Sequence, residues 1–391
     1  MNIILFDGIY HKNLLPLTYT RPVAELRIGM LTIKQKWEQY VENPIQIKTQ
    51  EYLAKKFGSP SEENSIGINA SILPSDDLMS SLLELKNKQI LTSKGKIVAV
   101  NPLPINSKNI EEALSEYKMV ETKAEFLQVE NVWDLFRLND QAIRADIELI
   151  KAAKTFVTPS PTNQILGNDI YIEEGAKVEC AILNTTTGPI YIAKGAEVME
   201  GSILRGPIAI CENGVVKMGA KIYGATTIGP YSKVGGEVNN CMIQGYSNKG
   251  HDGFLGNAVL GEWCNLGADT NNSNLKNNYQ SVDLYNYPEA KYLDTGLQFC
   301  GLVMGDHSKS AINTMFNTGT VVGVSANIYG ADFPSKFIPS YSWGGRKPLE
   351  YKFDKAMDTA KRVMERRNIS LTEEDLNILE YVYKESQKFR K

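Results

Sequence analysis

The chain has 391 residues, of which 42 are Lys or Arg and 45 are Asp or Glu, so its formal net charge at neutral pH is −3. This balance argues against nucleic acid as a partner, and the length is enough for two sizeable domains. The five cysteines form no CxxC pair and are odd in number, so we expect reduced thiols and a cytoplasmic protein. The apolar run Ile3–Phe6 is too short for a signal peptide and is interpreted as a first strand, and we expect no membrane span.

Residues 1–157 are predicted to form an α/β domain. Short apolar runs such as Ile97–Val100 alternate with helix-like stretches at 78–85 and 132–150, and this mixture is typical of that class. The segment Thr-Pro-Ser-Pro-Thr at 158–162 predicts a linker, because two prolines one residue apart resist both helix and strand pairing.

Beyond the linker, an aliphatic residue recurs at every sixth position, eight times in succession: Ile192, Val198, Leu204, Ile210, Val216, Ile222, Ile228 and Val234. The period matches neither the 3.6 of a helix face nor the 2 of a half-exposed strand. It is the period of a left-handed β-helix, in which one aliphatic residue per side points into a triangular prism. We therefore predict a left-handed parallel β-helix of hexapeptide repeats over residues 163–345, with Gly229 and Gly261 among its tight corners.

The phase of this repeat is broken in three places. It starts near Ile165 and slips by two residues before Ile192. After Val234 it is interrupted, and the expected inward positions then continue at Phe254, Leu260, Leu266, Met304, Ser310, Phe316, Val322 and Ile328. The Asn-rich segment 271–298 has no such phase and is expected to protrude as a loop. Residues 346–391 are predicted to be a solvated helical tail, with a capping box at 370–373.

One histidine lies where the repeat resumes, in the stretch that runs from Lys249-Gly250-His251 through Leu255-Gly256-Asn257-Ala258 to Asn274. A lone histidine is often structural, but a neutral imidazole can also act as a general base. The stretch resembles the acetyltransferase half of the bifunctional N-acetylglucosamine-1-phosphate uridyltransferase/glucosamine-1-phosphate N-acetyltransferase family. The resemblance implies that His251 deprotonates a sugar amine that attacks acetyl-CoA, that Asn265 lies in the sugar site, and that Asn274 contacts the acetyl end of the cofactor.

The stretch departs from the family pattern at several substrate-binding positions. Phe254 replaces a tyrosine, Leu275 replaces another, and the cationic residues that clamp the sugar phosphate have no clear counterparts. Lys249 is a candidate replacement, because phosphates require charge-assisted donors, although a solvated lysine fits the pattern equally well. Near the end of the prism, Trp343-Gly344-Gly345-Arg346-Lys347-Pro348 resembles the family's W-R-R-P element, which implies that Arg346 and Lys347 reach the phosphates of CoA; a surface dibasic pair is the alternative.

The N-terminal half resembles sugar-nucleotide pyrophosphorylases more weakly, through Leu15–Thr18 and the stretch from Arg21 to Gly29. Those enzymes carry a glycine-rich phosphate loop, for which this chain offers only Asp7-Gly8. Asp7, Arg21 and Arg27 are therefore the candidate nucleotide-binding residues for UTP or dTTP. Mg²⁺ is a further candidate here, although the family's Gly-Asp metal ligand has no clear equivalent, and paired arginines are also common in structural ion pairs.

These observations predict a nucleotidyltransferase-like domain joined to an acetyl-CoA-dependent amino-sugar-phosphate N-acetyltransferase of cell-envelope precursor biosynthesis, assembled as a homotrimer. The principal alternative is a non-catalytic trimeric scaffold or a regulatory nucleotide-sugar binder. A metal-dependent hydrolyase would require three histidines across a subunit interface. The prism offers only His251 and His307.

Overall fold

A computed structural model describes residues 1–61, 64–106 and 113–390. The chain divides into two compact units. The first comprises Met1–Leu14, Arg21–Leu26 and Leu31–Asn131, and the second comprises Leu15–Thr20, Arg27–Met30 and Val132–Lys391. The helices that follow residue 132 belong to the second unit.

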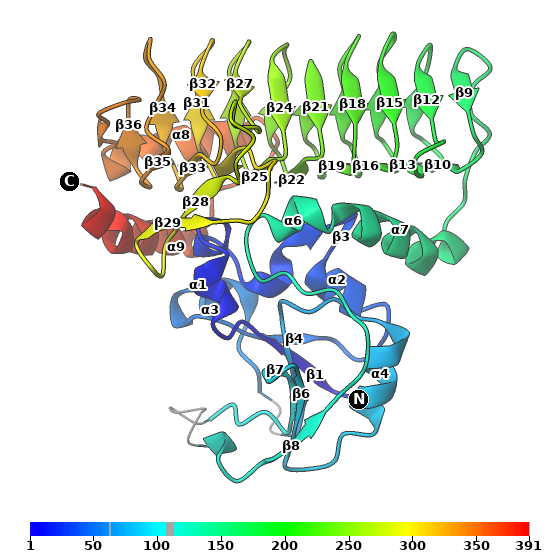
Figure 1. The fold of residues 1–391 in the computed structure, drawn as a ribbon, viewed down its shortest axis with the longest axis vertical. Helices are drawn as coiled ribbons and strands as arrows, with labels where there is room; N and C mark the ends of the chain where they lie inside the picture. The colour runs from blue at the N-terminus through cyan, green and yellow to red at the C-terminus, as the bar shows by residue number, and fades with distance from the viewer. Residues whose placement is uncertain (62–63, 107–112, 391) are drawn as a thin grey trace. The chain divides into compact units, whose positions relative to one another are not determined.

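The first unit is built on a six-stranded mixed sheet with the order β4-β1-β5-β7-β6-β8 (Figure 1). Its strands are β1 (Ile3–Phe6), β4 (Gln46–Lys48), β5 (Ile66–Asn69), β6 (Gln89–Ser93), β7 (Lys96–Asn101) and β8 (Lys118–Glu121). Its helices are α1 (Tyr10–Asn13), η2 (Val23–Glu25), α2 (Ile33–Trp37), α3 (Glu51–Phe57) and α4 (Asp76–Leu83). Strand β1 pairs in parallel with both β4 and β5, so the carboxyl ends of these three strands meet at one edge of the sheet. This edge is where open α/β sheets bind ligands.

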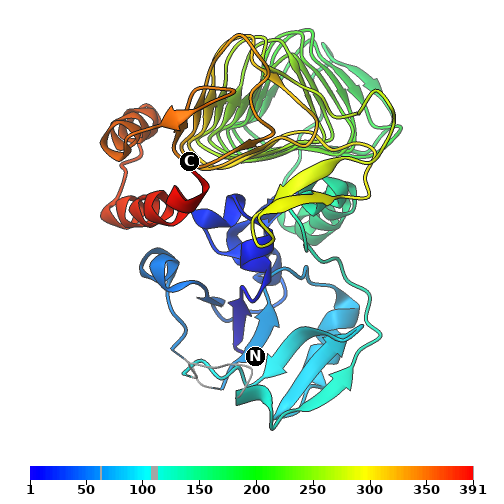
Figure 2. The same ribbon diagram turned by 60° about the vertical axis from the view of Figure 1, so that its left-hand side comes forward.

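The second unit is a parallel β-solenoid with three sides, as predicted (Figures 1 and 2). The first side holds β10 (Ile170–Ile172), β13 (Ile190–Ile192), β16 (Ile208–Ile210), β19 (Thr226–Ile228), β22 (Met242–Gly245), β25 (Val259–Glu262), β30 (Val303–Met304), β33 (Val321–Val322) and β35 (Phe337–Ile338). The second side holds β11 (Lys177–Val178), β14 (Glu197–Val198), β17 (Val215–Val216), β20 (Lys233–Val234), β23 (Asn248–Lys249), β26 (Asn265–Leu266), β31 (Lys309–Ser310), β34 (Asn327–Ile328), β36 (Ser342–Trp343) and the antiparallel β37 (Leu349–Glu350). The third side holds β9 (Gln164–Leu166), β12 (Ile182–Asn184), β15 (Ile203–Arg205), β18 (Lys221–Tyr223), β21 (Glu237–Asn239) and β24 (Phe254–Gly256).

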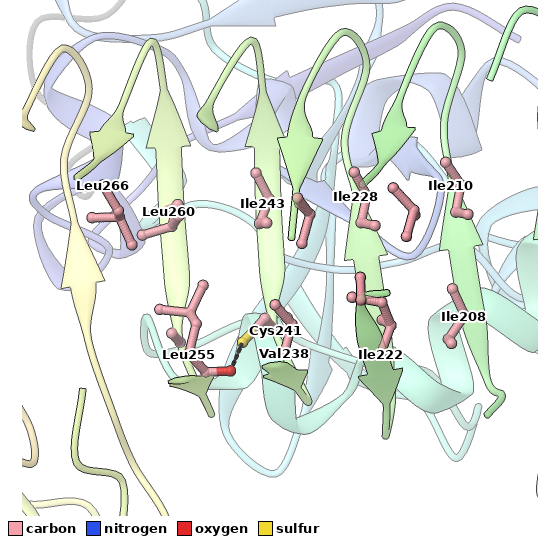
Figure 3. Packing of buried hydrophobic residues seen from close by; sticks show 14 of the residues in the cluster. Ile208, Ile210, Ile222, Ile228, Val238, Cys241, Ile243, Leu255, Leu260 and Leu266 are labelled. Atoms are coloured by element: carbon pink, nitrogen blue, oxygen red, sulfur yellow. Dashed lines mark hydrogen bonds between the residues drawn. The ribbon is translucent and has the colours of Figure 1, made fainter. Parts of the chain in front are cut away.

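All eight aliphatic residues of the six-residue repeat point into the prism, and none is more than 2% exposed. Figure 3 shows how such residues from successive coils stack against one another. The interruption after Val234 has a simple cause, because the coil shortens. Val216 pairs with Val234, 18 residues further on, whereas Val234 pairs with Lys249, only 15 residues further on. The predicted inward position at Phe254 is wrong by one residue: Val238 pairs with Leu255, which is 1% exposed, and Phe254 lies on the outside.

The corner glycines are required by the close approach of the next coil. A Cβ atom on Gly229 would lie 2.2 Å from the carbonyl oxygen of Gln244, and one on Gly261 would lie 2.2 Å from Oδ1 of Asp306. Positions with positive φ further along the same corner carry bulky residues instead: the rings of Tyr231, Tyr246, Trp263 and His307 stack in order, and successive centroids are 5.1, 4.4 and 6.2 Å apart.

The segment 271–298 leaves the prism wall only in part. Its first residues form β27 (Asn271–Asn272), which pairs with β32 (Met315–Phe316) as a continuation of the third side. The segment then forms an antiparallel hairpin of β28 (Asp283–Asn286) and β29 (Lys291–Asp294). The prediction that the whole segment protrudes as a loop is therefore wrong in detail, because part of it pairs as a hairpin in which Leu284 lies opposite Leu293.

The C-terminal tail is helical, as predicted, but it is packed rather than solvated. Helix α8 (Phe353–Glu365) buries Ala356, Met357, Ala360 and Met364. Helix α9 (Glu373–Glu385) buries Ile378, Leu379 and Val382, and the Leu379 carbonyl accepts a bond from the Tyr341 hydroxyl at 2.8 Å. The capping box is formed by Thr372 and Asp375, two residues later than predicted. The short helix η4 (Ser386–Phe389) follows.

Two further elements pack against the prism. Helix α6 (Asp134–Arg137) precedes α7 (Asn139–Ile150), which runs along the first side, where Asn139 donates to the carbonyl of Ala225 at 2.9 Å (Figure 1). The segment 27–30 is bound there as well, because the Gly29 amide donates to Asn139 Oδ1 at 2.8 Å. Within the described ranges, no helix is both long and apolar enough to cross a membrane.

Candidate functional site

The candidate site is built on the corner turn of residues 250–253, which joins β23 on the second side to β24 on the third side. Two glycines allow this turn to pack tightly between its neighbours. Gly236 on the preceding coil has φ +70°, and a Cβ atom there would lie 2.9 Å from the carbonyl oxygen of His251. Gly253 has φ +114°, and its Cβ would lie 2.3 Å from the Thr270 carbonyl oxygen on the following coil. Substitution at either glycine would push the turn out of place.

Hydrogen bonds from three directions hold the backbone of the turn. The Glu237 amide donates to the Gly253 carbonyl at 3.2 Å, and the Asp269 amide donates to the Asp252 carbonyl at 3.0 Å. From inside the prism, Nζ of Lys249 donates to the carbonyl of His251. The turn is therefore rigid in its backbone.

The side chain of His251 points away from this framework and is exposed. Its imidazole has no hydrogen-bond partner among residues 1–61, 64–106 and 113–390. A general base needs an acceptor on its second nitrogen to hold the reactive tautomer. One chain alone, as far as it is described, does not supply that acceptor.

Phe254 and Asn274 come together beside this turn, on the third side of the prism. A Cβ atom on Gly256 would lie 2.5 Å from Cζ of Phe254 and 2.7 Å from Nδ2 of Asn274. The same Nδ2 donates to Oδ1 of Asn257 at 2.8 Å. Gly256 therefore leaves room for an aromatic ring and an amide to meet, next to the turn that carries His251.

Asn265 lies on a different side of the prism. It belongs to β26 on the second side, where it pairs with Asn248 in the preceding strand and with Lys309 in the following one. The amide oxygen of Asn248 is bonded by Arg367, just after helix α8, at 3.3 Å. The turn of His251 is the corner between this second side and the third side. The structure therefore brings Phe254 and Asn274 together on one side of the turn and places Asn265 on the other side.

Lys249 is buried, with 2% of its surface exposed. Its ammonium is directed to the backbone of the turn rather than to solvent. Burial lowers its pKa from the ordinary value to about 8, while the charges of Asp252 and Asp269 oppose that shift. This geometry does not present the ammonium to a substrate phosphate.

A polar patch inside the prism near this turn was not predicted from the sequence. Asn272 occupies the inward position of β27, is 3% exposed, and binds both backbone groups of Gly256: Oδ1 accepts from its amide at 2.8 Å and Nδ2 donates to its carbonyl at 2.9 Å. Inward-facing Ser310 lies 3.0 Å from the hydroxyl of Thr270. The sequence does contain a sign of this patch, because polar residues stand at inward positions where the six-residue repeat would place aliphatic ones.

Arg346 and Lys347 lie at the carboxyl end of the prism, between β36 and β37, and both are exposed. Arg346 is 3.5 Å from Asp332 in a solvent-exposed ion pair. Lys347 lines a pocket of about 670 Å³ together with Phe337, Phe389 and Arg390. On the second side β36 is four strands beyond β23, so these cations are ~19 Å along the prism axis from the His251 coil.

In the first unit, Asp7 and Arg21 are both buried. Asp7 follows β1, and its two carboxylate oxygens accept bonds from the amide of Val23 at 2.8 Å and from the hydroxyl of Thr49 at 2.6 Å. Burial raises the pKa of Asp7 to about 6, although these two hydrogen bonds lower it. The carboxylate thus ties the ends of two strands together.

Arg27 belongs to the second unit. Its amide and its Nε donate to Gln244, at 2.7 and 3.1 Å, and its guanidinium also bonds the Met30 carbonyl. A nucleotide-binding role for this arginine remains a prediction.

Among the described residues, no three His, Cys, Asp or Glu side chains come together as a metal site built from protein ligands alone requires. Mg²⁺ that is held partly by substrate phosphates needs only one or two carboxylates, so Mg²⁺ in the N-terminal domain stays a prediction. Asn69, at the end of β5, accepts bonds from Ser71 and donates to the carbonyl of Ile97 at 3.2 Å. All five cysteines are free thiols.

Comparisons with known proteins agree with this architecture. The family described as "Sugar nucleotidyl transferase" matches residues 3–155. "Bifunctional protein GlmU" of Alkaliphilus metalliredigens is 25% identical over 258 residues, which cover 53% of this chain and 54% of that protein. A "bifunctional sugar-1-phosphate nucleotidylyltransferase/acetyltransferase" of Sulfurisphaera tokodaii is 24% identical over 285 residues, covering 72% of this chain and 62% of the relative. The chain thus spans little more than half the length of these curated relatives.

Two solved structures show weaker similarity. The UDP-N-acetylglucosamine acyltransferase from Campylobacter jejuni is 13% identical with a TM-score of 0.19, covering 57% of this chain and 94% of its own. The acetyltransferase domain of PglB from Neisseria gonorrhoeae gives the same identity and TM-score, covering 89% and 98%. A TM-score this low carries no weight for function. The sequence similarities, together with the fold, describe a GlmU-like chain: a nucleotidyltransferase-like N-terminal domain followed by a parallel β-solenoid and a small helical region.

Proposed function

We propose that this protein is a transferase whose prism acetylates the amine of an amino-sugar phosphate with acetyl-CoA, and whose N-terminal domain binds a nucleoside triphosphate for transfer to a sugar phosphate. The observation that carries the proposal is the rigid corner turn that presents an exposed imidazole beside Phe254 and Asn274. We propose a cytoplasmic location, because acetyl-CoA and nucleoside triphosphates are cytoplasmic metabolites.

In the proposed reaction, His251 accepts a proton from the sugar amine as its nitrogen attacks the thioester carbonyl. The C–N bond forms, the C–S bond breaks, and the departing CoA thiolate takes up a proton. Asn274 is assigned to the acetyl end of the cofactor and Asn265 to the sugar. Arg346 and Lys347 are assigned to the phosphates of CoA, and their ~19 Å separation from the His251 coil along the axis requires an extended cofactor.

We further propose a homotrimer with its active site between subunits. The support is the exposed imidazole, whose second nitrogen lacks an acceptor in the described part of one chain. A neighbouring subunit packed against this corner would supply the acceptor and exclude water.

The decisive experiment measures free thiol released from acetyl-CoA in the presence of a panel of amino-sugar 1-phosphates. His251→Ala should lower the rate by about 10²–10⁴, the usual effect of removing a general base, and should leave the melting temperature unchanged because the side chain is exposed. Met218→Ala, which truncates an exposed residue of the equivalent corner on an earlier coil, is the control and should change neither. A wild-type protein that releases no thiol with any acceptor would instead support a scaffold.

The N-terminal domain is tested by calorimetry with UTP and dTTP. Arg21→Ala should weaken nucleotide binding by about 1.5–3 kcal/mol, the value of a hydrogen bond to a charged group. Absence of heat with the wild type would remove nucleotide binding from the proposal.

A further inference from the structure

Lys249 occupies a position in the prism that the repeat reserves for aliphatic residues. Ile243, Lys249 and Leu255 are spaced six apart and supply the inward positions of one coil. In the stack along the second side, Lys249 follows Val234 and precedes Leu266, both of which belong to the hydrophobic core. The lysine stem therefore fills the space that a branched aliphatic side chain fills elsewhere.

Core stability does not explain a lysine at this position. A buried ammonium loses its hydration, and replacing buried charged groups with apolar residues of similar volume is often neutral or stabilising. A methionine has nearly the same length and would fill the row without that penalty. What the lysine adds is a charged donor inside the prism, directed at the carbonyl oxygen of His251.

The other bonds of the turn hold its later residues. Asp252 and Gly253 are bonded by the following and the preceding coil. Lys249 supplies the bond to the backbone of His251 itself. We infer that Lys249 is a positioning residue, which anchors the peptide of His251 from inside the prism and so fixes the direction in which the imidazole leaves the corner. The catalytic consequence rests on the proposed function.

The charge of Lys249 makes this anchor sensitive to alkaline pH. The titratable groups around it are the carboxylates of Asp252 and Asp269 and the thiol of Cys241, which all favour the ammonium. With its pKa lowered to about 8, Lys249 loses its proton above that pH and retains only a weaker, neutral donor. The folded state then binds fewer protons than the unfolded state between about pH 8 and the ordinary lysine pKa, so stability should rise with pH in that window.

The test compares Lys249→Met with Lys309→Met. Lys309 is a matched control, because its ammonium donates to the carbonyl of another histidine, His307, at 2.8 Å, and its pKa is also lowered to about 8. Lys249→Met should keep or raise the melting temperature and should reduce its rise above pH 8 by the part that Lys249 contributes, while the part from Lys309 remains. Hydrogen exchange of the Glu237 and Asp269 amides, which donate to carbonyls of the turn, should become faster, while exchange elsewhere in the prism is unchanged. Lys309→Met should leave exchange of these two amides unchanged.

In the acetyl-transfer assay, Lys249→Met should lower kcat by about 10- to 100-fold, taking as a guide the effect of losing the partners that orient metal-ligating side chains, with little change in the KM for acetyl-CoA. Unchanged exchange of the Glu237 and Asp269 amides would overturn the inference, even if the wild type has no acetyltransferase activity. Faster exchange with wild-type kcat would keep the anchor but remove its catalytic role. If the methionine variant does not fold, Lys249→Gln is measured in the same way, and failure of both to fold would make Lys249 a core residue and overturn the inference.

Discussion

At the scale of single residues, two buried polar side chains act as structural connectors. Asp7 joins the loop at Val23 to the end of β4 at Thr49. The side-chain amide of Asn272 bonds the amide and the carbonyl of Gly256, in place of the backbone groups that would pair with them in a regular strand ladder. Each fills an inner position where an apolar side chain would leave backbone or hydroxyl groups unsatisfied, so each is expected to resist replacement by residues of similar size.

The raised pKa of Asp7, about 6 in the folded state, predicts a specific pH dependence. The folded state holds a proton that the unfolded state releases near the ordinary value of 3.8, so the contribution of Asp7 to stability is complete below that pH and is lost as pH rises to about 6. Asp7→Asn cannot ionise. The free energy of unfolding of the wild type minus that of the variant should therefore fall by about 3 kcal/mol between pH 3.5 and pH 7.

Urea titrations of both proteins across this range measure the difference. Asparagine keeps an acceptor for the Val23 amide, and the Thr49 hydroxyl can turn to accept from its amide. A difference that stays constant with pH would mean that Asp7 titrates at its ordinary value.

Asn272→Leu tests whether polarity or size matters at the inward position of β27. The leucine suits an aliphatic row but leaves the amide and the carbonyl of Gly256 unpaired. At about 1–3 kcal/mol for each buried unsatisfied group, the variant should lose about 2–5 kcal/mol in denaturant unfolding. Ser273→Ala, an exposed neighbour, should lose nothing. An equally or more stable leucine variant would show that the aliphatic row governs this coil.

At the scale of elements, the sequence predicted strands better than connections. Each aliphatic residue of the repeat is buried by its own strand and the two adjacent coils. The inward positions of these strands could therefore be predicted from the six-residue repeat alone. Coil length is set by corner geometry, and the shortening from 18 residues to 15 before Lys249 displaced the expectation for Phe254 by one residue, whereas Leu260 and Leu266 are buried as predicted.

The buried face of helix α8 shows what could not be predicted. Ala356, Met357, Ala360 and Met364 form an amphipathic stripe, but the sequence does not say which surface covers it. The candidate site divides in the same way. The turn of His251 could be predicted because its motif is contiguous, whereas the hydrogen bond from Lys249 depends on which way a lysine points at a corner.

The start of α9 offers a sharp comparison. The Thr372 hydroxyl accepts from the Asp375 amide at 3.2 Å, and the Asp375 carboxylate bonds the Thr372 amide at 3.1 Å. Thr372→Ala should therefore cost about 1 kcal/mol of stability. Ser370→Ala, at the residue that the sequence pattern favoured, should be nearly neutral. Chemical unfolding measures both, and the opposite ranking would move the helix start back to the predicted position.

At the scale of the whole molecule, the division into two units does not follow chain order. The segments 15–20 and 27–30 belong to the second unit although they lie within the first in sequence. The Thr20 hydroxyl donates to Asp306 at 2.7 Å across 286 residues of chain. Cutting the chain at a single site after Asn131 would therefore remove from the prism two segments that it binds, so separate expression of the halves is expected to destabilise the second.

The proposed homotrimer predicts that light scattering at micromolar concentration returns the mass of three 43.5 kDa chains. Specific acetyltransferase activity should then fall when the protein is diluted until the trimer dissociates, because the site needs a neighbouring subunit. A monomer mass with full activity would contradict both the assembly and the shared site.

The hairpin insertion in the prism has a kinetic and evolutionary consequence. Val259 pairs with Val303 as closely as Met242 pairs with Val259, although 44 residues rather than 17 separate the first pair. Growth of the prism across this junction costs only ~0.8 kcal/mol more in loop-closure entropy, which slows that step by a small factor. The stack of coils therefore accommodates an inserted segment at this point with little loss of stability. Because the insertion begins one coil after the His251 turn, it is a place where natural variation or laboratory grafting can change what approaches the His251 corner without rebuilding the prism.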